Sequence, residues 1–138
     1  MIIKGKLIKC KREVKVFKGK ETKEQLYITV AEVDLTKEQL KELNDAFADA
    51  GKKFTPDWVT DPKGYVNLKT EFELPCKDLE GEKHDSIEKF VKDFAWVGAD
   101  VQVSLNVKDG AVYPVAVVFK STGKAFDPFA EFDNDEED

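Results

Sequence analysis

The sequence predicts a mainly β domain with short helices, in which five antiparallel strands form a small barrel. Runs in which apolar and polar residues alternate recur along the chain and are separated by turn residues, which is typical of strands. Two segments instead show the spacing of an amphipathic helix. The chain has 138 residues, 41% of them hydrophobic, with ten Phe, three Tyr and two Trp. One domain of this size can bury a core without disulfides or metals.

The first two strands are expected to form a hairpin. Residues 2–17 have an extended pattern in which Val14 and Val16 take the apolar phase, and Gly19 then offers a turn. Residues 25–33 are rich in β-branched and aromatic side chains, which favour strands. The apolar phase of this second strand consists of Leu26, Ile28 and Val30.

A helix is predicted over residues 37–50. Thr36 can cap its start, and Gln39 stands three residues on, as in a capping box. Gly51 stands where a left-handed cap is favoured. The apolar face of the helix would consist of Leu40, Leu43 and Phe47.

A third strand is predicted over residues 65–74, after an irregular connection over residues 52–64 that contains two prolines. Its apolar phase consists of Val66, Leu68, Phe72 and Leu74. Its opposite side consists of Tyr65, Asn67, Lys69 and Glu71. Because proline lacks the N–H that a strand needs, Pro75 ends the strand.

A short helix and a hairpin complete the domain. Asp85 and Glu88 frame the helix. Its inner face would consist of Ile87, Phe90, Val91 and Phe94. Residues 101–120 alternate strictly at first, and Asp109-Gly110 predicts a tight turn between two strands. Pro114 predicts a bulge or an unpaired edge position in the last strand.

This order of elements fits the OB fold, a five-stranded antiparallel barrel, with one helix after the second strand and a short helix before the last hairpin. Greek-key α+β folds with other strand pairings fit the same order. Beyond Gly123 the periodicity is lost and acids dominate. We therefore expect one OB-like domain over residues 1–123 and a disordered acidic tail over residues 124–138.

Charge is distributed unevenly along the chain. The net charge is -6, yet residues 1–24 hold nine bases against three acids, and the last twelve residues hold seven acids and no base. The nine bases are Lys4, Lys6, Lys9, Lys11, Arg12, Lys15, Lys18, Lys20 and Lys23. Such a segment can hold a polyanion, and the acidic tail can compete with that polyanion for the same surface.

The sequence has no run that approaches the roughly 20 apolar residues of a membrane span. Its Lys-rich start also lacks the apolar centre of a signal peptide. We therefore expect a cytoplasmic protein with no membrane partner. In a reducing compartment, Cys10 and Cys76 are expected to be free, partly buried thiols.

A catalytic site is hard to assemble from these residues. The one histidine, His84, lies beside Asp85 and Ser86, too close in sequence to form a triad with them, and is expected to be a solvated loop residue. Two cysteines and one histidine, widely spaced, fall short of a zinc site. Asp57 and Asp61 could bind Mg²⁺, but both flank prolines and look like turn formers. We expect no catalytic residue, no metal and no cofactor.

The residues fit a binding protein better. Proteins that bind single-stranded nucleic acid combine a basic groove for phosphates with aromatic faces on which bases stack. Phe17, Tyr27 and Tyr65 fall on the polar phase of predicted strands, so they either stack bases or pack under loops or the inserted helix. Trp58, in a loop, is a fourth candidate, whereas Trp96 is expected in the core. The predicted nucleic-acid-binding residues are Lys4, Lys6, Lys9, Lys11, Arg12, Lys15, Phe17, Lys18, Lys20, Tyr27, Trp58, Tyr65 and Lys69.

The tail combines aromatic and acidic residues, which is typical of a docking segment or of a solubilising tail. Its predicted partner-binding residues are Asp127, Pro128, Phe129 and Phe132. The hairpin VQVSLNVKDGAVYPVAVVF, followed by DPFAEF and acids, resembles the end of bacteriophage-type single-stranded DNA-binding proteins of the OB fold. The resemblance is firmest over residues 98–138.

The resemblance implies a replication or recombination protein that coats exposed strands in the host cytoplasm and recruits partners through its tail. Bacterial single-strand binders finish in acids followed by a terminal Pro-Phe. Here Pro128-Phe129 precedes the acids and Asp138 is last. A phage-encoded partner is therefore easier to accommodate than a host pocket that binds a terminal Phe carboxylate.

The leading hypothesis is a sequence-tolerant single-stranded DNA-binding protein without enzymatic activity. The main alternative is an acidic DNA mimic that inhibits a nucleic-acid enzyme, which the net charge favours and the basic start opposes. A small nuclease or another metal-dependent enzyme is a third hypothesis. A homodimer is compatible with the sequence, which leaves the oligomeric state open.

Overall fold

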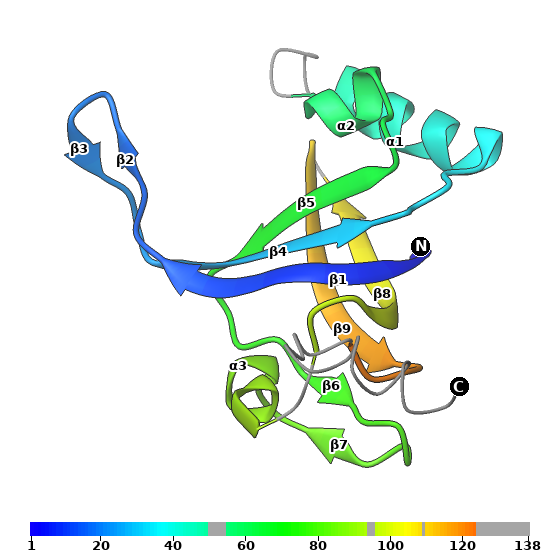
Figure 1. The fold of residues 1–138 in the computed structure, drawn as a ribbon. Helices are drawn as coiled ribbons and strands as arrows, with labels where there is room; N and C mark the ends of the chain where they lie inside the picture. Colours follow the sequence, from blue (N-terminus) through cyan, green and yellow to red (C-terminus); the bar gives the residue numbers. More distant parts are fainter. Residues whose placement is uncertain (50–54, 94–95, 109, 124–138) are drawn as a thin grey trace, which may run out of the picture.

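A computed structural model describes residues 1–49, 55–93, 96–108 and 110–123, and it shows a mainly β fold with short helices, as predicted (Figure 1). In chain order the elements are β1 (Ile2–Glu13), β2 (Val16–Phe17), β3 (Lys20–Glu21), β4 (Gln25–Ala31), α1 (Lys37–Asp49), α2 (Asp57–Thr60), β5 (Tyr65–Thr70), β6 (Cys76–Lys77), β7 (Lys83–His84), α3 (Ile87–Phe90), the 3₁₀ helix η1 (Val91–Asp93), β8 (Ala99–Lys108) and β9 (Ala111–Phe119). None of the helices described is both long and apolar enough to cross a membrane.

The main sheet has seven strands in the order β5-β4-β1-β8-β9-β6-β7, and β6 runs parallel to β9. The predicted five-stranded antiparallel barrel is therefore not confirmed. Between Pro75 and the short helix, where no strand was predicted, the chain forms β6 and β7. The amide of Val117 donates to the carbonyl of Pro75 (3.1 Å). At the other edge of the sheet, some Cα atoms of β5 lie within 8 Å of Cα atoms of β9. Within the described ranges, however, these two strands are not paired by backbone hydrogen bonds.

The core lies on the inner side of the curved sheet. The apolar phase predicted for the second strand is confirmed, since Leu26, Ile28 and Val30 are buried. In β8 the alternating residues Val101, Val103 and Leu105 are buried as well. Phe72 was expected inside but is 76% exposed. The strand ends at Thr70 and the chain bends at residues 71–72, so the alternation that continues through Leu74 breaks at this bend.

Helix α1 begins as predicted. Gln39 N donates to Thr36 Oγ1 (3.1 Å), and Thr36 N donates to Gln39 Oε1 (3.0 Å), which satisfies two amides at the helix start. Leu43 and Phe47 are buried, whereas Ala50 and Gly51 lie outside the described residues. The connection expected to be irregular contains the short helix α2, which buries Trp58.

A bulge interrupts β1 at Ile8. Leu7 pairs with Val30 on β4, but Lys9 pairs with the next residue, Thr29, so β1 has one residue more than its partner. The extra residue reverses which side chains of β1 face the core. Leu7 is buried before the bulge and Cys10 packs against the core after it.

Beyond β1 the chain forms a small two-stranded projection, β2 and β3, which we term the finger (Figure 1). Val14 and Val16 were expected in the apolar phase but are exposed, because β1 ends at Glu13 and the finger leaves the main sheet. Lys18 and Gly19 both have positive φ (52° and 78°), as a type I′ hairpin turn requires. The turn expected at Gly19 is thus confirmed.

The last hairpin, β8 and β9, contains the bulge that Pro114 predicted. Ser104 pairs with Ala116 and Leu105 with Pro114, so Val115 is the extra residue. Before this hairpin, α3 buries Ile87 and the adjoining η1 buries Val91, as expected for the short helix. Phe94, expected on the same face, lies outside the described residues.

Candidate nucleic-acid interface

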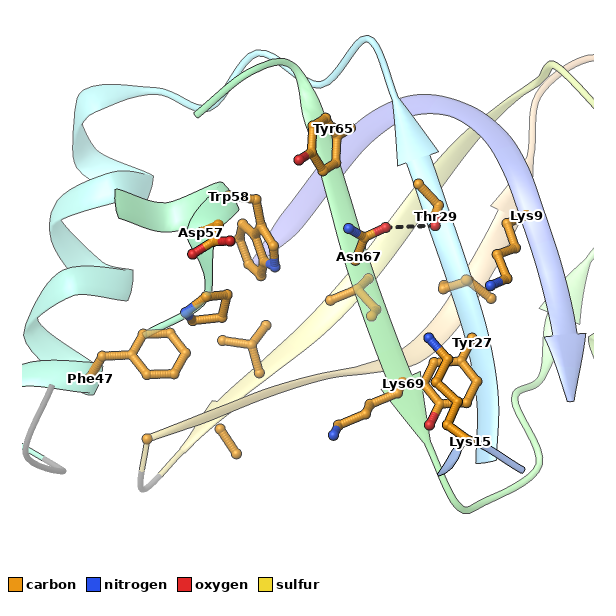
Figure 2. Close-up of a pocket in the computed structure, with 16 residues that line it drawn as sticks. Lys9, Lys15, Tyr27, Thr29, Phe47, Asp57, Trp58, Tyr65, Asn67 and Lys69 are labelled. Atoms are coloured by element: carbon orange, nitrogen blue, oxygen red, sulfur yellow. Dashed lines mark hydrogen bonds between the residues drawn. The ribbon is translucent and has the colours of Figure 1, made fainter. Parts of the chain in front are cut away.

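The outer side of β1, β4 and β5 carries a hollow of about 720 Å³ (Figure 2). Tyr27 and Thr29 reach it from β4, and Tyr65, Asn67 and Lys69 reach it from β5. Lys9 and Lys15 also line it, and its remaining walls are Phe47 of α1, residues 56–58 at α2 and residues 110–112 at the turn between β8 and β9. The residues that alternate with these along β4 and β5 are buried in the core: Leu26, Ile28, Val30, Val66 and Leu68. Because successive side chains of a strand point to opposite faces, the polar and aromatic side chains of the hollow lie on the outer side.

Strand register places the hollow's polar and aromatic side chains in rows across three strands. Paired residues project on the same side of a sheet. One row consists of Lys11, Tyr27 and Lys69. The next row consists of Lys9, Thr29 and Asn67. The third consists of Lys6, Ala31 and Tyr65. Two tyrosines and four lysines therefore share one continuous face, which we term the sheet face.

The predicted stacking residues differ in exposure. Tyr65 is 39% exposed and Tyr27 is half-buried, so both can present a ring to a ligand. Trp58, in contrast, is only 5% exposed and packs in the core, although it lines the hollow. Trp58 was predicted in a loop, and α2 instead turns its ring inward, which leaves little surface for a base.

Tyr27 is surrounded by lysines. Lys15 Nζ lies 4.1 Å from the centroid of the Tyr27 ring, and Lys9 Nζ lies 5.7 Å from it. Cations at these distances are attracted to the π face of the ring. Lys9 Nζ also lies 3.0 Å from a carboxylate oxygen of Glu13, and this hydrogen bond lowers the pKa of Glu13. Lys11, Lys15 and Lys69 form no ion pair with a carboxylate in the described part of the chain.

Thr29 and Asn67 form a polar pair in the middle of the sheet face. The hydroxyl of Thr29 donates to Asn67 Oδ1 (2.7 Å), as Figure 2 shows. The pair was not predicted as part of the site. Asn67 had been placed on the polar side of its strand, next to Tyr65 and Lys69, so the alternation was a signal that could have identified it.

Arg12 is held away from the sheet face by protein partners. Its Nε and Nη2 donate to the carboxylate of Glu88 (2.9 and 2.6 Å), and this hydrogen bonding raises the pKa of Arg12. Its Nη1 donates to the carbonyl of Glu71 (3.4 Å), and Nη2 also donates to the carbonyl of Phe72 (3.3 Å). Arg12 follows the bulge and lies on the opposite side of β1 from Lys11. We therefore leave Arg12 out of the proposed interface.

The other predicted residues lie in two further places. Phe17, Lys18 and Lys20 lie on the finger, where Phe17 is 66% exposed and Lys18 Nζ is 5.5 Å from its ring centroid. Lys4 and Lys6 line a separate hollow over β1 and β8. The predicted partner-binding residues, Asp127, Pro128, Phe129 and Phe132, lie outside the described residues.

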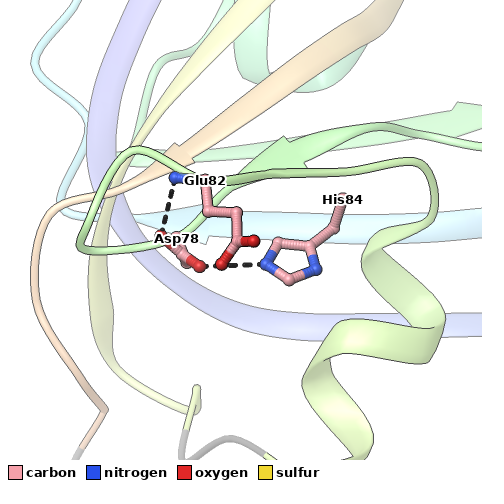
Figure 3. A group of neighbouring side chains, drawn as sticks. All are labelled: Asp78, Glu82 and His84. Atoms are coloured by element: carbon pink, nitrogen blue, oxygen red, sulfur yellow. Dashed lines mark hydrogen bonds and ion pairs between the residues drawn. The ribbon is translucent and has the colours of Figure 1, made fainter.

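Asp78, Glu82 and His84 gather at the β6–β7 hairpin (Figure 3). Their ligand atoms lie within 4.8 Å of one another, so they could hold a metal ion. Protein contacts also account for the cluster: Asp78 Oδ1 accepts the amides of Glu80 and Glu82 (2.9 Å each), and Asp78 Oδ2 lies 3.0 Å from His84 Nε2. His84, expected to be solvated, is partly buried in β7, with its ring centroid 4.5 Å from that of Phe90.

Cys10 and Cys76 are free thiols, as predicted. Burial raises the pKa of Cys10 to about 12 and that of Cys76 to about 11. Because the thiolate is the nucleophilic form, both side chains are poor candidates for covalent chemistry.

No protein-family model and no curated protein matches this sequence. The structure is similar to the single-stranded DNA-binding protein from bacteriophage Enc34, with 12% identity and a TM-score of 0.45, over 99% of this chain and 90% of that chain. The same phage protein in complex with single-stranded DNA has 12% identity and a TM-score of 0.49, over 91% of this chain and 89% of that chain. The resemblance stated from the sequence is to the same class of protein.

Proposed function

We propose that this chain is a sequence-tolerant single-stranded DNA-binding protein that acts without catalysis. The observation that carries the proposal is the sheet face, where Tyr27 and Tyr65 lie with Lys9, Lys15 and Lys69 around one open hollow. Lys11 pairs with Tyr27 and adds a further cation to this face. Bases of any sequence have a π face that can stack on a tyrosine, and lysines can neutralise the phosphates between them.

Charge favours this proposal over a DNA mimic. A mimic has to present carboxylates at the positions of phosphates, whereas the hollow is lined by Lys9, Lys15 and Lys69 and by one carboxylate, Asp57, among the described residues. The negative net charge of the chain owes much to the last twelve residues, which hold seven acids.

We further propose a role in DNA replication or recombination, with the finger contributing Phe17, Lys18 and Lys20 beside the sheet face. Residues 124–138 would recruit a partner protein through Asp127, Pro128, Phe129 and Phe132. Support for partner recruitment by residues 124–138 comes from composition alone, since aromatic residues among acids are suited to a partner with an apolar, basic pocket.

A binding titration tests the proposed function. Fluorescence anisotropy of a labelled oligothymidine should show tighter binding than to a duplex of the same length, because stacking requires unpaired bases. The logarithm of the affinity should fall with the logarithm of the salt concentration, by about 0.7 for each phosphate neutralised. Equal affinity for both forms, or no binding at low salt, would refute the proposal.

A further inference from the structure

A second hollow, of about 290 Å³, lies on the outer side of β1 and β8. Lys4, Lys6 and Lys120 line it together with Glu32 and Asp100. We propose that a single strand bound on the sheet face crosses β1 at Lys6 and continues into this hollow, which holds phosphates without stacking bases. The inference rests on the proposed function and adds a second subsite to it, with Lys120 as a new contact.

The two hollows belong to one continuous surface. Lys6 pairs with Ala31 on β4, and Ala31 pairs with Tyr65 on β5. Neighbouring strands are about 4.8 Å apart, so the backbones of Lys6 and Tyr65 are separated by roughly 10 Å. On its other side Lys6 pairs with Asp100 on β8. A bound strand that leaves Tyr65 therefore reaches the second hollow by crossing two strands.

The bulge at Ile8 places the lysines of β1 on one side. Lys4 and Lys6 precede the bulge, and Lys9 and Lys11 follow it. In a strand without a bulge, even-numbered and odd-numbered residues face opposite sides, so the two pairs would be separated by the sheet. With the extra residue, all four project outward and form a row that spans roughly 23 Å at about 3.3 Å per residue.

The chemistry of the second hollow suits phosphate. Lys6 Nζ lies 3.3 Å from Asp100 Oδ1, so its charge is partly offset, whereas Lys4 and Lys120 form no ion pair with a carboxylate of the described residues. None of the described residues that line this hollow is aromatic. It therefore lacks a surface on which a base could stack, and its contribution should depend on salt and not on base identity.

The test compares two double variants that remove the same charge. Lys4→Gln/Lys120→Gln removes two lysines of the second hollow. Lys89→Gln/Lys92→Gln removes two exposed lysines beside Arg12 and Glu88, which line neither this hollow nor the sheet face. Circular dichroism and urea unfolding establish that each variant is folded. Each protein is then titrated with oligothymidines of about 4 to 16 nucleotides, the range of site sizes known for single-strand binders.

The expected result depends on oligonucleotide length. The shortest oligonucleotide that binds should occupy the sheet face alone and bind the Lys4→Gln/Lys120→Gln variant as tightly as the wild type. The longest should bind this variant more weakly. For this oligonucleotide, the slope of log affinity against log salt concentration should be less steep in the variant than in the wild type. The difference should be about 0.7 for each phosphate that is no longer neutralised, and so about 1.4 for the two lysines. The Lys89→Gln/Lys92→Gln variant should match the wild type at every length.

Two other outcomes would overturn the inference while the proposed function stands. In the first, the Lys4→Gln/Lys120→Gln variant binds the longest oligonucleotide as tightly as the wild type does. In the second, both double variants lose the same affinity at every oligonucleotide length, which would indicate a general effect of net charge. Failure of the wild type to bind any of the oligonucleotides would instead refute the proposed function, and the subsite with it.

Discussion

Tyr27 offers the sharpest test of the sheet face, because it lies on the middle strand of the face, β4, with lysines around its ring. We predict that Tyr27→Ala weakens binding to an oligothymidine by roughly 1–3 kcal/mol, the usual cost of removing an aromatic side chain on which a base stacks. This corresponds to a loss of about 5- to 140-fold in affinity. Tyr27→Phe keeps the ring and should bind within a few-fold of the wild type.

The fold should survive this substitution. Tyr27 projects outward and is half-buried, while the core positions on either side of it, Leu26 and Ile28, are unchanged. Lys15 Nζ lies 4.1 Å from the centroid of this ring, and the substitution removes their cation–π interaction. At an exposed site this loss lowers the free energy of unfolding by about 0.5–1 kcal/mol. Urea unfolding would measure this cost separately from binding.

Phe72→Ala is the matched control. Phe72 is also an aromatic residue, but it is 76% exposed, lies on the bend after β5 and does not line the hollow. Fluorescence anisotropy at two salt concentrations should show unchanged affinity for this variant. If folded Tyr27→Ala binds like the wild type, or if Phe72→Ala loses as much affinity, the assignment of the sheet face is refuted.

Four further predictions follow from charge and burial. Truncation after Lys124 should leave the fold intact and raise affinity in an oligothymidine titration, because the acids removed compete with phosphate; weaker binding by the truncated protein would contradict this. Glu88→Gln should lower the free energy of unfolding in urea by roughly 1–3 kcal/mol, since Arg12 loses its charged acceptor; an unchanged urea midpoint would show that the pair does not stabilise the fold. Because burial raises the pKa of both thiols, Cys10 and Cys76 should react with iodoacetamide at pH 8 far more slowly in the native protein than in urea, and equal rates would contradict the burial. His84 and two backbone amides lower the pKa of Asp78, so its charge stabilises the fold above the ordinary carboxyl pKa of about 4 and this contribution is lost as pH falls; the stability difference between wild type and Asp78→Asn should therefore shrink from pH 6 to pH 3, and a constant difference would refute the linkage.

Elements held by local interactions could be predicted from the sequence. The capping box at Thr36 and Gln39 involves residues three apart, and the bulge at Pro114 follows from one residue's missing N–H. Tyr27 and Tyr65 were placed on the outer side because alternation in β4 and β5 continues without a break through both positions. These features depend on a few neighbouring residues, so the pattern of the sequence contains them.

Features that depend on distant partners could not be predicted in this way. β6 pairs with the nearby β7, but it joins the main sheet because Cys76 and Lys77 pair with Val117 and Val118, about forty residues later in the chain. Trp58 is buried because α2 packs it against the core, although its neighbours in sequence are turn residues. Arg12 was predicted to bind phosphate because of its lysine neighbours, yet its guanidinium forms an ion pair with Glu88, which is far from it in the sequence.

The bulge at Ile8 left a signal in the sequence. Leu7 and Cys10 both contact the core, and their spacing of three cannot fit a strand of period two. A regular strand that kept Leu7 inside would also bury Lys9 and Lys11, at a cost of several kcal/mol for each unpaired charge. The cost of burying these charges thus favours the bulge independently of any ligand. The bulge cannot be deleted without disturbing the core, whereas each lysine of the row can be replaced alone, so substitutions at Lys4, Lys6, Lys9 and Lys11 separate binding from folding.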